Sequence, residues 1–294
     1  MNVVSFLPLL LFAVGGDDPR GVFYVIAYDE PPVTLRILEV TWEGNVTHQA
    51  PIELPDPRGL TFDPIERKLY TYDALFGFIF SIEPKTGDVQ AVAPVPFAPV
   101  ADLAFNPSNG DFYLSVMGNN SNDFAIIVDP ISWNWRRHVT VRFTQGCVYM
   151  PNLVGNLGGV LFKASRFQTL PSGCPYCLVF LNDLNDRAST HYSPAEFGDS
   201  WPLVFDSVGD QLYAIGIEPF PSLVYRFWKV DPIRGNYTES ELAWSQTLGF
   251  SAIEFVPPQE SEDFTCSLDA DSDSDGDIDL RDYAAWQNCY TGPR

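Results

Sequence analysis

The chain has 294 residues, of which 46% are hydrophobic and 14% aromatic, so it can bury a large core and is not a disordered chain. Its formal net charge of −21 argues against partners that are themselves anionic, namely nucleic acid and acidic lipid surfaces. The 21 glycines and 25 prolines predict many turns.

The N-terminal segment reads MNVVSFLPLLLFAVGG, an apolar run that ends in small residues. This pattern predicts a signal peptide over residues 1–16, with a buried first strand as the alternative. The run is too short to span a bilayer, and no later segment is long and apolar enough to do so. We therefore expect a secreted protein that works outside the cell or at its surface, with no membrane span.

A six-residue motif recurs through the body of the chain. Four copies read GLTFDP (59–64), DLAFNP (102–107), PLVFDS (202–207) and AIEFVP (252–257), and a fifth segment reads NLVGNL (152–157). The aliphatic anchors of these segments, spaced by 43 to 50 residues, are Leu60, Leu103, Leu153, Leu203 and Ile253. This spacing is typical of one propeller blade per repeat.

Three further strands are predicted after an anchor. The second carries an apolar residue followed by an aromatic one, at Leu69-Tyr70, Phe112-Tyr113, Leu161-Phe162 and Leu212-Tyr213. Turn residues such as Asn109-Gly110 separate it from the anchor strand, which is hairpin spacing. The third strand often ends in a turn such as Ile82-Glu83-Pro84, and a more polar fourth strand follows.

The two ends of the body complement each other. Residues 21–54 contain three predicted strands without an anchor, whereas Ile253 is an anchor without a following hairpin. Pairing them would close a ring and remove its exposed sheet edges. We therefore predict an all-β, five-bladed β-propeller over residues 17–258, closed by N- and C-terminal strands, with an irregular sandwich as the alternative. The blade GLTFDP…KLYTYD…FIFSIEPKTG resembles those of NHL-like propellers, which implies the fold and no particular function.

Residues 271–282 read DSDSDGDIDLRD, which predicts a calcium loop. With Gly276 at the sixth position, the acids fall at positions one, three, five, seven, nine and twelve: Asp271, Asp273, Asp275, Asp277, Asp279 and Asp282. Alternating carboxylates supply the hard oxygen ligands that Ca²⁺ requires, and the glycine permits the sharp turn around the ion. The alternative is a solvated acidic tail.

This loop resembles a dockerin repeat of the EF-hand type, in which aspartate takes the twelfth position. The resemblance implies a small helical module over residues 259–294 with Leu280, Tyr283 and Trp286 on its exit helix. It also implies attachment to a cohesin-like partner, although dockerins carry two repeats and this chain has one. The single repeat could instead self-associate in a surface assembly or pack on the propeller. Cys266 and Cys289 flank the loop, and we expect a disulfide between them.

The remaining candidates for chemistry are few. Cys174-Pro-Tyr-Cys177 matches a redox motif, but its place in a loop favours a disulfide between the two or from one of them to Cys147. Three histidines, His48, His138 and His191, are each predicted on the outermost strand of a blade, where they cannot converge.

Two carboxylates, Asp102 and Glu254, are the acids predicted to face the central channel. We expect a non-enzymatic protein that binds or adheres through its propeller, to a protein or a carbohydrate. The alternative is a secreted hydrolase or lyase acting on a polysaccharide, which would need a carboxylate pair at the channel.

Overall fold

The computed structural model describes residues 20–258 except 29–33, 96–99, 108, 117–123, 130–134, 141–143, 155–156, 165–175, 183–187, 194–201, 219–222, 233–235 and 247–248. The chain divides into two compact units, residues 1–257 and 258–294. Apart from Pro258, the described residues all belong to the first unit. The predicted signal peptide, the calcium loop at 271–282 and the cysteines Cys174, Cys266 and Cys289 lie outside the described residues.

The described strands form five four-stranded antiparallel sheets. Four of these sheets are built from strands that follow one another in the chain. The first contains β4 (Pro57–Asp63), β5 (Lys68–Asp73), β6 (Phe78–Ile82) and β7 (Val89–Pro94). The second contains β8 (Val100–Phe105), β9 (Phe112–Val116), β10 (Phe124–Val128) and β11 (Trp135–Thr140), and the third contains β12 (Thr144–Val154), β13 (Leu157–Ala164), β14 (Tyr176–Asn182) and β15 (Ala188–Ser193). The fourth contains β16 (Leu203–Asp206), β17 (Gln211–Glu218), β18 (Leu223–Val230) and β19 (Tyr237–Gln246).

The fifth sheet combines both ends of the body. It contains β20 (Gly249–Val256), β1 (Val22–Tyr28), β2 (Leu35–Val40) and β3 (Val46–Pro51), in that spatial order. β20 pairs with β1 in an antiparallel register that places Phe23 opposite Phe255. The predicted pairing of the N-terminal and C-terminal strands is therefore confirmed.

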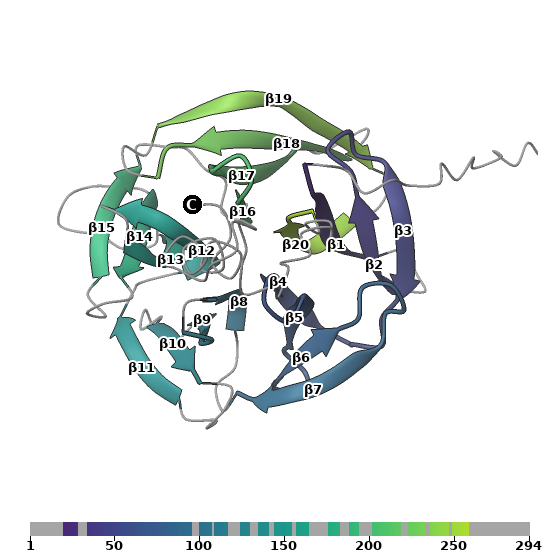
Figure 1. The fold of residues 1–294 in the computed structure, drawn as a ribbon, viewed down its shortest axis with the longest axis horizontal. Coiled ribbons are helices and arrows are strands. Elements are labelled where there is room, and N and C mark those ends of the chain that lie inside the picture. The colour runs from purple at the N-terminus through teal and green to yellow at the C-terminus, as the bar shows by residue number, and fades with distance from the viewer. Residues whose placement is uncertain are drawn as a thin grey trace, which may run out of the picture. The chain divides into compact units, whose positions relative to one another are not determined.

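The sheets are arranged around a common centre in a propeller-like ring (Figure 1). The innermost strands are β4, β8, β12, β16 and β20, and each contacts the next one, with β20 returning to β4. The all-β, propeller-like prediction is confirmed, and the described part of the chain contains no helix, hence none that could cross a membrane.

The acid of the repeated motif closes the hairpin that follows the innermost strand. The Oδ1 atom of Asp63 accepts hydrogen bonds from the backbone N–H groups of Ile65 and Glu66. Asp206 does the same for Val208 and Gly209. Such carboxylate-capped turns explain why the motif places an acid after its phenylalanine. The last copy has Val256 at this position, and β20 is the last strand among the described residues.

The predicted anchor of the fifth repeat, Leu153, is wrong in register. In β12 the residue opposite the aromatic Phe162 is Cys147, just as Thr61 lies opposite Tyr70 in β4. The residue equivalent to the anchor Leu60 is therefore Gly146. The strand β12 continues to Val154, with an irregularity after Met150, so its hairpin turn lies farther from the repeat position than in the other sheets.

The core lies between neighbouring sheets, because the inner strands are apolar on both faces. The sheet that joins the termini packs on the β16–β19 sheet through an aromatic cluster that includes Phe23, Trp42, Phe227, Trp244 and Phe255. The rings of Phe23 and Trp244 meet edge to face, 5.1 Å between centroids, and the indole N–H of Trp244 donates to the carbonyl of Trp42 at 3.2 Å. This seam fixes the two ends of the body to the rest of the ring.

Candidate functional site

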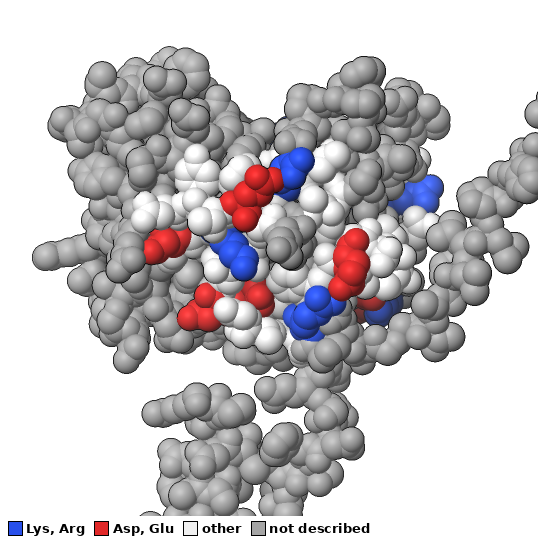
Figure 2. Space-filling view, turned by 90° about the horizontal axis from the view of Figure 1, so that it is seen from above, with Lys and Arg blue, Asp and Glu red and all other residues white. Residues whose placement is uncertain are grey.

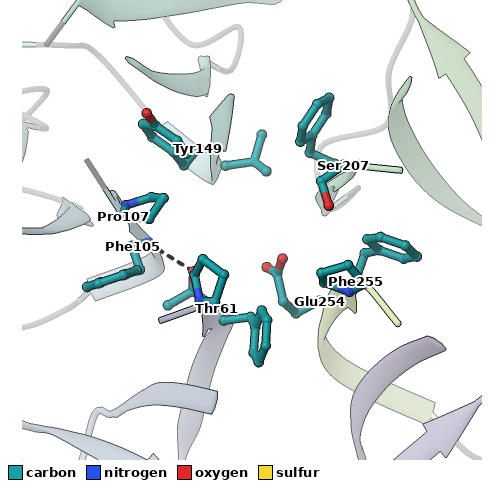
Figure 3. A pocket seen from close by; sticks show the side chains of 12 residues that line it. Thr61, Phe105, Pro107, Tyr149, Ser207, Glu254 and Phe255 are labelled. Carbon is teal, nitrogen blue, oxygen red and sulfur yellow. Dashed lines mark hydrogen bonds between the residues drawn. The ribbon is translucent and has the colours of Figure 1, made fainter. Parts of the chain in front are cut away.

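A pocket of about 230 Å³ opens between the five innermost strands (Figure 3). The strands β4, β8, β16 and β20 contribute side chains at or just beyond their last residues, whereas β12 contributes Val148 and Tyr149, which precede its irregularity after Met150. The lining is mostly aromatic, aliphatic and proline side chains, and includes Phe62, Phe105, Val148, Phe205 and Phe255. These residues occupy the phenylalanine position of the repeat, so the repeat itself builds the pocket wall.

Glu254 of β20 is the one charged side chain among the lining residues (Figure 3). It occupies the repeat position that Thr61, Ala104 and Val204 hold in other innermost strands. Its carboxylate is directed into the pocket (Figure 3). Burial raises the pKa of Glu254 well above its usual value, the charge of Asp102 raises it further, and the Phe255 N–H opposes both. The sequence-predicted acid therefore faces the channel, in a site that favours its neutral form while empty.

Asp102, the second predicted acid, is buried in the ring interior and does not line the pocket. Its Oδ1 accepts from its neighbour Leu103 N–H and its Oδ2 from Cys147 N–H on the next inner strand, both at 2.9 Å. Gly59 on β4 makes room for this carboxylate, because a Cβ there would collide with the Asp102 Oδ1 atom. Burial raises the pKa of Asp102 to about 7, against the effect of the two N–H donors.

The two acids therefore do different things. A carboxylate pair that hydrolyses a glycosidic bond needs both groups at the substrate. Among the residues that the structure describes, Glu254 alone meets that requirement, since Asp102 holds two inner strands together. Asp56, a further acid near an inner strand, forms an ion pair with Arg58 at 2.8 Å.

Neighbouring inner strands are tied in a second place as well. The Thr61 Oγ1 atom on β4 accepts a hydrogen bond from the Phe105 N–H on β8 at 2.9 Å (Figure 3). Nearby on β9, the hydroxyl of Ser115 is the buried side-chain polar atom without a partner in the described part of the chain. The sequence did not single out either residue, because both lie in apolar strand patterns.

The Cys147 thiol is free and buried, and its sulfur lies 3.8 Å from the Tyr113 carbonyl oxygen. The alternative pairing of Cys147 with Cys174 or Cys177 is therefore not formed in this structure. Burial raises the pKa of this thiol well above its usual value, and the charges of Asp102 and Glu254 raise it further. A thiol of this kind is a poor nucleophile, so Cys147 acts as a small core residue.

The predicted places of the histidines are confirmed. His48, His138 and His191 lie on β3, β11 and β15, the outermost strand of each sheet. The Nε2 atom of His48 lies 2.8 Å from the Lys85 carbonyl oxygen of the neighbouring sheet, so it contributes to packing at the rim. Within the described ranges, no group of three or more His, Cys, Asp or Glu side chains could hold a metal ion.

Charges on the outside are mixed. On the face shown in Figure 2, described Lys and Arg side chains are interspersed with Asp and Glu. Ion pairs such as Lys85–Glu39 at 2.7 Å and Arg226–Glu239 at 2.6 Å join acids and bases on the sheets. Exposed pairs of this type contribute little to stability.

Comparison with known proteins supports the fold. No protein-family model matches the chain, and no curated protein sequence matches it. A chain from the crystal structure of a nidogen/laminin complex is similar over 80% of this chain and 97% of its own length, with 10% identity and a TM-score of 0.55. TolB from Acinetobacter baumannii is similar over 81% of this chain and 68% of its own, with 13% identity and a TM-score of 0.45. At such identities the likeness to the first of these shows the propeller-like fold and no function.

Proposed function

We propose that this protein is a secreted, non-enzymatic binding protein: a five-bladed propeller whose pocket holds part of a protein partner, with a calcium-dependent, dockerin-like tail for attachment. The observation that supports the binding role is that only one of the two predicted acids lines the pocket. Asp102 is held by the Leu103 and Cys147 N–H groups, which leaves the pocket with the single carboxylate of Glu254. An apolar pocket with one polar anchor is typical of a binding site.

The surroundings of the pocket support a protein partner. The turns that follow β4 and β16 carry Ile65 and Val208, which are 74% and 54% exposed. Each lies next in sequence to a residue that lines the pocket, Pro64 and Ser207 respectively. Apolar side chains that flank a pocket in this way favour contact with another protein surface. The similar chain from the nidogen/laminin complex is itself part of a protein complex.

The attachment role rests on the sequence of the tail. Six aspartates alternate through residues 271–282 around Gly276, and they would repel one another without a cation. Calcium would therefore order the loop and could couple it to a cohesin-like partner or to a second copy of the module.

Calorimetric titration of the chelator-stripped full chain with Ca²⁺ tests the tail. We expect one site per chain, abolished by Asp271→Ala and retained in the control Asp269→Ala, which removes an acid just before the loop. No heat at millimolar Ca²⁺, or equal binding by both variants, would contradict the calcium role.

The alternative function is cleavage of a polysaccharide by hydrolysis or by elimination. One observation favours it: the pKa of Glu254 is raised, and a carboxyl of raised pKa in a pocket can act as a general acid. Release of reducing or unsaturated sugars from acidic and neutral polysaccharides would test it. Turnover that is lost in Glu254→Gln would replace the binding proposal, and no turnover by the wild type is the result we expect.

A further inference from the structure

We propose that the pocket binds an ammonium group, and that its occupant is a lysine side chain on the partner protein. This inference rests on the proposed binding function and names the chemistry that the pocket would recognise.

The first argument is the charge of the pocket. Glu254 is the only charged lining residue, and among the residues that the structure describes no ion pair reaches it. Burying a carboxylate without a countercharge is costly, and a cation that enters the pocket would remove that cost. Because the empty site favours the neutral carboxyl, the entering cation would displace a proton from Glu254.

The second argument is the wall. Phe62, Phe105, Phe205 and Phe255 surround the space into which Glu254 projects. Aromatic rings attract cations and also suit the methylene chain that carries an ammonium group. One of these rings already attracts a cation of the chain itself, since the Arg67 guanidinium carbon lies 5.5 Å from the centroid of Phe62.

The third argument concerns size and donors. A pocket of about 230 Å³ accepts one side chain, not an oligosaccharide. Glu254 and the Ser207 hydroxyl both point into it, from β20 and from the turn after β16 (Figure 3). Two separate acceptors suit the three tetrahedral donors of an ammonium better than the planar fork of a guanidinium, which prefers one bidentate partner.

The fourth argument identifies the source of the lysine. The C-terminal segment 258–294 follows the pocket residue Pro257 in sequence, but it holds ten acids, two arginines and no lysine. It therefore lacks the group that the pocket recognises. The exposed Ile65 and Val208 beside the pocket provide apolar contact that a free amine would not use, so a protein partner fits better than a small amine.

Binding of the full chain to immobilised, capped nonapeptides tests the proposal. The peptides have random flanks and a fixed central lysine, arginine or norleucine, and Ca²⁺ is present throughout. We expect the lysine pool to bind best and Glu254→Gln to weaken it roughly tenfold or more, or about 1.4 kcal/mol. The control Glu239→Gln removes the same charge from the outer strand β19 and should leave binding unchanged.

Proton release provides a second readout. Calorimetry of the lysine peptides in buffers of different ionisation heat should show protons released on binding, and the affinity should rise with pH until Glu254 is ionised in the free protein. The charged and titratable groups that act on Glu254 are Asp102 and, through its thiol, Cys147. Glu254→Gln should abolish the release, whereas binding without proton release at every pH would overturn the role of Glu254.

Two outcomes separate this inference from the function beneath it. Equal binding of all three pools, lost in Ile65→Asp and Val208→Asp, would overturn the ammonium assignment and leave the protein-binding function standing. Tighter binding of the arginine pool would likewise overturn it in favour of a guanidinium. Failure of every pool to bind the wild-type chain would contradict both.

Discussion

Two carboxylates on the inner strands of the same ring have opposite surroundings. Asp102 meets two backbone N–H groups within the ring, one of them on the neighbouring strand β12, and a glycine on the other neighbour leaves it room. Glu254 projects into an open pocket whose other lining residues carry no charge. Burial raises the pKa of both, so pKa alone does not distinguish them. What distinguishes them is where the donors and the carboxylates lie: Asp102 binds an N–H group of the neighbouring strand β12 and so links two strands, whereas Glu254 binds the N–H of its own neighbour Phe255 and lines the pocket, where a ligand can reach it.

The pH dependence of stability gives the largest expected effect on this comparison. Asp102 titrates near pH 7 in the folded chain but near 3.8 when unfolded, so the folded state binds more protons between these values. The contribution of Asp102 to the free energy of unfolding is therefore fully present below about pH 4 and is lost as the pH rises through 7. The loss across this range is on the order of 4 kcal/mol. Denaturant unfolding of wild type and Asp102→Asn across pH 4 to 8 measures it. If the free energy of unfolding changed with pH equally in the wild type and in Asp102→Asn, Asp102 would not be the buried acid described above.

The glycine that accommodates Asp102 gives the next effect. Gly59 has a φ of +67°, and an added Cβ would also lie 2.8 Å from the Leu103 nitrogen. We expect Gly59→Ala to lower the free energy of unfolding by about 3 kcal/mol, from backbone strain and collision together. The control Gly110→Ala has a φ of +78° but no atom within 4 Å, so it should cost only about 1 kcal/mol. If thermal unfolding showed that Gly59→Ala and Gly110→Ala lower stability equally, the space that Gly59 leaves for the Asp102 carboxylate would not contribute to stability.

The acids of the hairpin turns sharpen the comparison, because Asp63 and Asp206 are as buried as Asp102 but bind N–H groups of their own turn. Asp63→Ala and Asp206→Ala each remove a carboxylate that caps two turn N–H groups. We expect each variant to lose about 2 kcal/mol of stability, the upper range for removal of a capping acceptor. Urea unfolding measures both. No loss in either variant would mean that these carboxylates do not hold the turns.

Glu254→Gln tests whether the burial of this acid costs stability. The raised pKa means that folding disfavours the ionised carboxyl, so the neutral glutamine should raise the free energy of unfolding at neutral pH, and the difference should vanish as the pH falls below the pKa of an unfolded glutamate. Thermal unfolding in parallel with the peptide assay measures it. A large destabilisation would mean that Glu254, like Asp102, belongs to the structural frame.

The sequence predicts the strands well because its repeat encodes both a strand and the turn after it. The acid that follows Phe62 and Phe205 caps a hairpin, and such local hydrogen bonds leave a readable pattern. The repeat is misplaced in β12, where Gly146 and Cys147 stand at the positions of an aliphatic anchor and its neighbour. Nothing local marks those two residues as an inner strand, since only the pairing with Phe162 shows their register.

The site is less predictable than the fold, for a physical reason. An acid in an apolar strand is conspicuous, and both Asp102 and Glu254 could be selected in this way. Their different roles depend on Gly59 and on the N–H of Cys147, which belong to other sheets and approach Asp102 only in the folded ring. The pocket likewise needs residues from all five inner strands together.

The pairing of β1 with β20 has a consequence for the order of folding. The strand β1 emerges early in synthesis, but its inner neighbour consists of residues 249–256, so one edge of β1 stays open until nearly the whole body of the chain has been made. Contacts of such long sequence separation form slowly, and an open edge invites pairing with other chains. The strand β20 therefore closes the ring last by covering the inner edge of β1. A chain that ends before residue 249 would leave this edge of β1 unpaired and prone to aggregation.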